Sequence, residues 1–131
     1  MYLVLIETSG NQNYIFSTNK LRENIGASEL TYRAGTEWVL KAVQKITHTV
    51  IWDEDTIKLR ANLLNPILNK PIENSDSVVE VLIATSGKAL LLTKEYQDAK
   101  QIIQEVTLKA IKEAPNLDIC GVISAPFDWN N

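Results

Sequence analysis

The chain has 131 residues, which suits one compact domain over residues 1–131, either a whole protein or the first domain of a longer one. Its net charge of −3 at pH 7 excludes the overall basic field that supports non-specific nucleic-acid binding. A single cysteine excludes an internal disulfide, and no apolar run reaches the roughly 20 residues of a membrane-spanning helix, so we expect a cytoplasmic protein with no membrane partner.

The first predicted element is a strand from Leu3 to Ile6, which ends at Glu7 and the polar turn Thr8-Ser9-Gly10. A short amphipathic helix follows it. In many α/β proteins such a turn holds phosphate, because exposed backbone N–H groups meet the positive end of the helix dipole there, and the acid is available to a metal ion. A capped turn without any ligand explains the same residues equally well.

A long helix is predicted next. Ser28 is placed to cap it, and its apolar side chains recur with i, i+4 spacing, as in a helix with one face on a sheet. These side chains are Leu30, Ala34, Trp38, Ala42 and Ile46. Gly35 lies inside this pattern and predicts close packing against a neighbouring element.

The segment after the long helix has a different pattern. β-Branched and aromatic residues from Thr47 to Trp52 predict a short strand, and a helix is expected from Asp53 to Leu64. The adjacent acids Asp53, Glu54 and Asp55 resemble a metal site, but the helix dipole alone also favours acids at this position, and we prefer that explanation. A loop with two prolines follows, up to Ser77.

Two apolar runs, Val78 to Ala84 and Ala89 to Thr93, predict a tight antiparallel hairpin with its tip at Thr85-Ser86-Gly87-Lys88. Both arms are apolar almost throughout, which is typical of strands at the centre of a sheet. A helix from Glu95 to Ala114 and a last strand from Leu117 to Ser124 complete the chain.

This order of elements predicts an α+β fold on the ferredoxin-like β-α-β-β-α-β plan. We expect an antiparallel sheet of about four strands with two main helices on one face, and an extra strand-helix excursion at residues 47–77. In that plan the first strand lies antiparallel to the second arm of the hairpin. The plan therefore predicts that Glu7 lies next to the hairpin tip.

The residues between Leu3 and Leu30 also resemble a known family. The runs are Ser9-Gly10-Asn11-Gln12-Asn13-Tyr14-Ile15-Phe16, Asn19-Lys20-Leu21-Arg22-Glu23 and Ile25-Gly26-Ala27-Ser28-Glu29-Leu30. Together they resemble the opening of the palm domains in the large polymerase-cyclase subunit of type III CRISPR effector complexes and their stand-alone relatives. The resemblance is dense here and looser over the remaining residues.

The resemblance implies a nucleotide site with one departure from the family. Palms that join nucleotides hold two divalent ions between carboxylates, and active members of this family have G-G-D-D at the hairpin tip. Glu7 matches their first-strand acid, whereas the tip here, residues 85–88, contains no carboxylate. One acid cannot hold two ions, and Lys88 repels a cation. We therefore expect a degenerate palm with no catalytic residues.

The favoured hypothesis is a nucleotide-binding or assembly module in anti-phage defence or nucleotide signalling, which pairs with a second palm domain. Its phosphate-binding residues would be Thr8, Ser9, Gly10, Asn11, Ser28 and Lys88, with Glu7 as the remaining metal ligand and ATP with Mg²⁺ or Mn²⁺ as the ligand.

Two other functions stay open. One is a minimal nucleotidyltransferase or cyclase, making cyclic or oligomeric nucleotides, whose missing acids come from a partner chain or from Asp53, Glu54 and Asp55. The other is a module that contacts RNA, directly or through a complex. Direct RNA binding is less favoured, because the hairpin and the last strand offer no aromatic side chains for base stacking.

Overall fold

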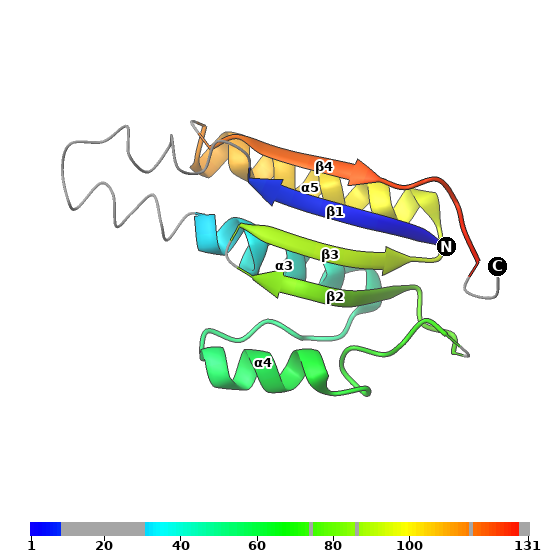
Figure 1. The fold of residues 1–131 in the computed structure, drawn as a ribbon. Helices are drawn as coiled ribbons and strands as arrows, with labels where there is room; N and C mark the ends of the chain where they lie inside the picture. Colours follow the sequence, from blue (N-terminus) through cyan, green and yellow to red (C-terminus); the bar gives the residue numbers. More distant parts are fainter. Residues whose placement is uncertain (9–30, 74, 86, 116, 129–131) are drawn as a thin grey trace.

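The structure, a computed structural model, describes residues 1–8, 31–73, 75–85, 87–115 and 117–128. Among these residues, four strands form one antiparallel sheet in the order β2-β3-β1-β4: β1 (Tyr2–Thr8), β2 (Val79–Thr85), β3 (Lys88–Thr93) and β4 (Ile119–Ile123). Two helices, α3 (Glu37–Thr47) and α5 (Tyr96–Glu113), lie behind the sheet in Figure 1, and α4 (Thr56–Leu64) lies beyond β2. The predicted ferredoxin-like α+β fold is confirmed.

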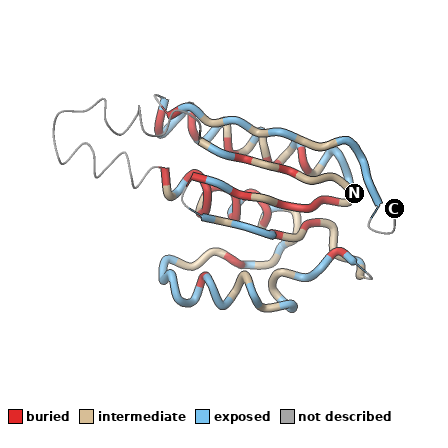
Figure 2. Tube along the Cα trace, in the orientation of Figure 1, coloured by how far each residue is buried: buried red, intermediate tan, exposed pale blue. Residues whose placement is uncertain are grey.

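The core lies between the sheet and the two helices α3 and α5. Burial alternates along β1, where Val4 and Ile6 are buried while Glu7 is exposed, so one face of the strand packs on the helices. Of the side chains predicted to line the core from the long helix, Ala34, Trp38 and Ala42 are buried and Ile46 is partly buried, while Leu30 lies outside the described residues. Figure 2 shows this inner layer of buried residues, whose helical members include Ala34, Trp38, Val39, Ala42 and Val43 before the hairpin and Ala99, Ile102, Val106 and Ala110 after it.

The long helix is interrupted at Thr36. Residues 31–35 are helical, and α3 begins after Thr36, whose φ of −124° and ψ of −77° are not helical. At Gly35 a Cβ atom would lie 2.3 Å from the carbonyl oxygen of Thr85 and 2.5 Å from the backbone nitrogen of Lys88. The predicted close packing at Gly35 is therefore confirmed: the helix touches the backbone of the hairpin turn.

The predicted strand from Thr47 to Trp52 is wrong. α3 ends at Thr47, and residues 48–52 form no strand. The reason is a side-chain acceptor: Gln44 Oε1 accepts hydrogen bonds from the backbone N–H groups of Ile51 (2.9 Å) and Trp52 (2.8 Å). Because these donors are already satisfied, the segment packs as an irregular chain beside α3.

The hairpin is confirmed, but the prediction that both arms lie centrally is wrong for β2. β3 pairs on both sides, whereas β2 is an edge strand. An irregularity in the pairing between Val81 and Ile83 marks a bulge at Leu82, and both Leu82 (41%) and Ile83 (40%) are partly exposed. A bulge of this kind disturbs the free edge of a sheet and limits pairing with other chains.

Candidate functional site

The sheet face opposite to α3 and α5 has a defined pattern near the hairpin tip. The strand registers align one residue from each strand in a row that crosses the sheet at this end, namely Thr85, Lys88, Glu7 and Cys120. The next row on the same face is entirely apolar and consists of Ile83, Leu90, Leu5 and Val122. We call these the polar row and the apolar row, and we call this side of the sheet the open face.

The polar row brings Glu7 and Lys88 together. The two residues are directly opposed in the antiparallel pairing of β1 and β3, and both side chains are exposed. Opposed residues of antiparallel strands project on the same face. The backbone N–H of Thr8 also donates to the carbonyl oxygen of Gly87 at 2.9 Å, which fixes the end of β1 against the turn. The prediction that Glu7 lies beside the hairpin tip is confirmed.

The tight turn itself depends on one glycine. Gly87 has a φ of 75°, a backbone conformation that favours glycine, and its N–H donates to the carbonyl oxygen of Thr31 at 3.1 Å. The turn is thereby held from both sides, by β1 and by the helix at residues 31–35. This double support gives Lys88 a fixed backbone position at the start of β3.

The residues of the polar row do not fit a pair of divalent ions. A two-ion site needs several carboxylate oxygens, and Glu7 is the only acid of this row, with an ammonium group as its direct neighbour. Among the residues that the structure describes, no three His, Cys, Asp or Glu side chains gather as metal ligands. The chemistry that this arrangement does support is electrostatic: Lys88 can attract an anion.

The other residues predicted to bind the ligand do not join Glu7 and Lys88: one lies on the other side of the sheet, and the rest are outside the described residues. Ser9, Gly10, Asn11 and Ser28 lie outside the described residues. The hydroxyl of Thr8 donates to the carbonyl oxygen of Gly87 at 3.4 Å, and alternation along β1 places Thr8 on the side of the sheet opposite to Glu7. Of the predicted ligands within the described ranges, Glu7 and Lys88 therefore share one surface.

One of the three acids before α4 caps the helix. Asp55 accepts hydrogen bonds from the backbone N–H groups of Ile57 (2.8 Å) and Lys58 (3.2 Å), and Asp53 accepts one from Asp55 (2.8 Å). The preferred explanation of these acids is confirmed for Asp55, which is the N-cap. Strands β2 and β3 lie between the α4 side of the sheet and Glu7, so these acids do not join Glu7 within one chain.

Sequence reasoning missed the apolar row. Val122 is 54% exposed and Ile83 40% exposed, although both have aliphatic side chains. Farther along the open face Leu92 is buried, and there the backbone N–H of Ile72 donates to Glu80, the neighbour of Leu92 in the register. The loop after α4 therefore covers that end of the face and leaves the end near the hairpin tip open. The signal was present in the sequence, because β1 and β3 are apolar on both faces.

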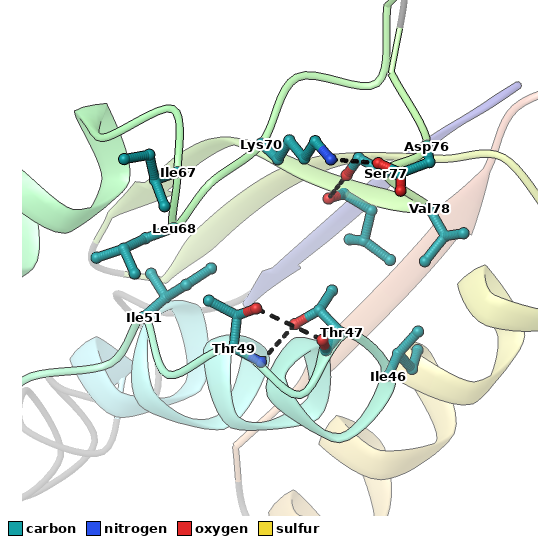
Figure 3. A pocket seen from close by; sticks show the side chains of 11 residues that line it. Ile46, Thr47, Thr49, Ile51, Ile67, Leu68, Lys70, Asp76, Ser77 and Val78 are labelled. Atoms are coloured by element: carbon teal, nitrogen blue, oxygen red, sulfur yellow. Dashed lines mark hydrogen bonds and ion pairs between the residues drawn. The ribbon is translucent and has the colours of Figure 1, made fainter.

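Among the residues that the structure describes, two cavities lie beside β2, outside the open face. The one in Figure 3 has a volume of about 210 Å³ and lies between the end of α3 and the start of β2. Its hydroxyl groups are committed to the chain itself, since Thr47 bonds to Val43 and Thr49, and Ser77 bonds to Val79. Lys70 pairs with Asp76 at its rim and lowers the pKa of that carboxyl below its ordinary value, first by a hydrogen bond and then by its charge.

The second cavity, of about 260 Å³, lies between α4 and the end of β2, where it is lined by Tyr32, Thr36, Thr56, Leu59, Arg60, Leu63, Ala84 and Thr85. Thr85 also belongs to the polar row. This cavity and the Glu7–Lys88 pair therefore lie at the same end of the sheet.

The chain was also compared with known proteins. Neither the models of known protein families nor the curated proteins give a match to this sequence. Within the described part of the chain, none of the helices has the length and apolar character needed to cross a bilayer.

Proposed function

We propose that this chain is a catalytically degenerate palm domain of the CRISPR polymerase-cyclase type, which binds a nucleotide or assembles with a second palm on its open face. The observation that supports this proposal is the direct opposition of Lys88 and Glu7 at a hairpin tip without carboxylates. The resemblance of residues 3–30 to such palms provides the family context, in anti-phage defence or nucleotide signalling.

The charge at the tip favours an anion over a metal ion. In a palm that joins nucleotides, carboxylates at this tip hold the cations that neutralise the triphosphate. Here the ammonium group of Lys88 occupies the same region and neutralises phosphate directly, in the manner of other phosphate-binding lysines. Nucleotide binding at this site is therefore independent of a divalent ion.

The open face is also self-complementary. Lys88 and Glu7 occupy the two central strands of one row. Two copies can pack with their open faces together, related by a two-fold axis that runs parallel to the strands between β3 and β1. In this arrangement Glu7 of each copy lies over Lys88 of the other. The same axis places Leu90 over Leu5 in the apolar row. Such a contact is isologous, as in most symmetric dimers, and it excludes water from the exposed aliphatic side chains.

Calorimetric titration with ATP tests the nucleotide-binding part of this proposal. We expect ATP to bind equally well with Mg²⁺, with Mn²⁺ and with a chelator present. Lys88→Ala should abolish binding, because it removes the cation at the tip, whereas Glu7→Ala should leave it intact. Binding that requires the metal and is lost in Glu7→Ala contradicts the proposal.

One observation favours the alternative of a minimal nucleotidyltransferase or cyclase. Thr56, the residue next to Asp55, lines the same cavity as Thr85 of the polar row, so the excursion brings its acids to the hairpin end of the sheet. A partner chain that docks on the open face would be needed to supply acids opposite Glu7. Pyrophosphate release from ATP by the purified protein distinguishes this function from the degenerate palm.

A further inference from the structure

The cavity between α4 and β2 exists because α4 packs loosely on the domain. Of the nine residues of this helix, Leu59 alone is buried. From the rest of the domain, Tyr32 and three short side chains face it, namely Thr36, Ala84 and Thr85. The helix and the rest of the domain therefore do not pack tightly, and a cavity of about 260 Å³ lies between them.

The lining combines an apolar wall with hydrogen-bond donors that have no partner among the described residues. Leu59, Leu63 and Ala84 supply aliphatic surface. Within the described ranges, no ion pair or hydrogen bond engages the guanidinium of Arg60 or the hydroxyl of Tyr32. The cavity of Figure 3 differs in this respect, because its hydroxyls and its Lys70–Asp76 pair already bond to the chain. An apolar cleft with a few convergent polar groups is the usual form of a small-molecule site.

These groups define the class of ligand. A guanidinium donates hydrogen bonds only and stacks on aromatic faces, so beside an aliphatic wall it suits a flat ring with acceptor atoms. The volume of about 260 Å³ lies just below the range of drug-sized pockets, which suits a single or fused ring. The aliphatic wall excludes a purely ionic ligand.

We infer that this cavity binds a planar heteroaromatic ring of nucleobase size, with its acceptor atoms directed toward Arg60 and Tyr32. Thr85 lines the cavity and is opposed to Lys88 in the polar row, so a nucleotide whose ring occupies the cavity would direct its phosphate toward Lys88. This last step rests on the proposed function, whereas ring binding itself does not require it.

A titration observed by methyl NMR tests the inference, with the nucleosides adenosine, guanosine, cytidine and uridine, with ATP, and with inorganic tripolyphosphate. The aromatic ring current of a bound base should shift the methyl signals of Leu59 and Leu63, and tripolyphosphate should not. Arg60→Gln should weaken nucleoside binding by about tenfold or more, because it removes a charge-assisted hydrogen bond. Lys58→Gln is the matched control, since it removes a cation from the same helix outside the lining.

A second variant fills the cavity without altering its charge. Ala84→Leu should abolish the nucleoside-induced shifts, while Ile111→Leu, on the exposed surface of α5, should not. The inference is overturned if none of the four nucleosides shifts the Leu59 and Leu63 methyls, or if Arg60→Gln binds them as well as the native chain does. ATP binding that Lys88→Ala abolishes, with both methyl signals unmoved, would leave the proposed function standing and remove this inference alone.

Discussion

Single residues decide whether the hairpin tip can approach its neighbours. Gly35 faces backbone atoms of the turn, and Gly87 adopts a positive φ within it. No side chain fits at the first position, and few residues tolerate the second. These two glycines hold the turn against the helix, and Lys88 follows directly after Gly87.

Gly35→Ala should therefore destabilise the domain by about 3 kcal/mol, because the new methyl group meets backbone atoms that cannot move aside. Urea denaturation measures the effect as a lower midpoint with an unchanged slope. Gly121→Ala is the matched control: the three atoms nearest to its Cβ, from 2.8 Å, all belong to the side chain of Ile103, which yields more readily than backbone, so a smaller loss of about 1–2 kcal/mol is expected. Equal losses in the two variants would contradict the packing argument.

At the scale of elements, the segment at residues 48–52 shows where a local pattern fails. Its β-branched and aromatic composition predicts a strand, but a strand forms only where the backbone groups of the segment pair with those of another strand. Here Gln44 supplies the acceptor for two backbone donors, and Asn62 donates to the carbonyl oxygen of Ile51 at 2.9 Å. Hydrogen bonds to the side chains of Gln44 and Asn62 thus take the place of the strand pairing that the composition predicts.

Gln44→Ala should cost about 2 kcal/mol, because two backbone N–H groups lose their acceptor in a partly buried place. Amide hydrogen exchange at Ile51 and Trp52 should accelerate at the same time. Gln44→Glu keeps an acceptor oxygen at this position and should preserve slow exchange. Unchanged exchange in Gln44→Ala would show that these hydrogen bonds do not hold the segment.

The elements that determine the site were largely predictable. The apolar run of β1, the turn residues of the hairpin and the spacing of the long helices predicted the ferredoxin-like order, and that order placed Glu7 beside the tip. The apolar row was not predicted, because it depends on the cross-strand register. The cavity beside Arg60 was not predicted either, because it depends on how loosely α4 packs. Such features arise from packing between distant segments.

At the scale of the whole molecule, the two faces of the sheet differ. One face is covered by α3 and α5 (Figure 1), and the hairpin end of the other exposes the aliphatic residues Ile83 and Val122. Exposed aliphatic surface that is gathered in one place, with charges at its border, is typical of a protein–protein interface. The two-fold arrangement proposed for this face would bury its apolar row and pair Glu7 of each copy with Lys88 of the other.

Sedimentation velocity over a range of concentrations tests this association. We expect a dimer of the native chain, weakened at least about tenfold in Val122→Lys, because the new charge would be buried in the contact. Ile111→Lys is the control, since Ile111 is 68% exposed on α5, in the layer behind the sheet. A native chain that is monomeric at every concentration, or a dimer that only Ile111→Lys disrupts, would contradict the proposed interface.

The most direct test of the degenerate palm is the release of pyrophosphate from ATP by the purified protein in the presence of Mg²⁺ or Mn²⁺. Because the polar row has one carboxylate and a lysine where two ions would have to bind, we expect no release above that of a protein-free blank, in the native chain and in Glu7→Ala alike. Pyrophosphate release by the native chain that disappears in Glu7→Ala would contradict the account.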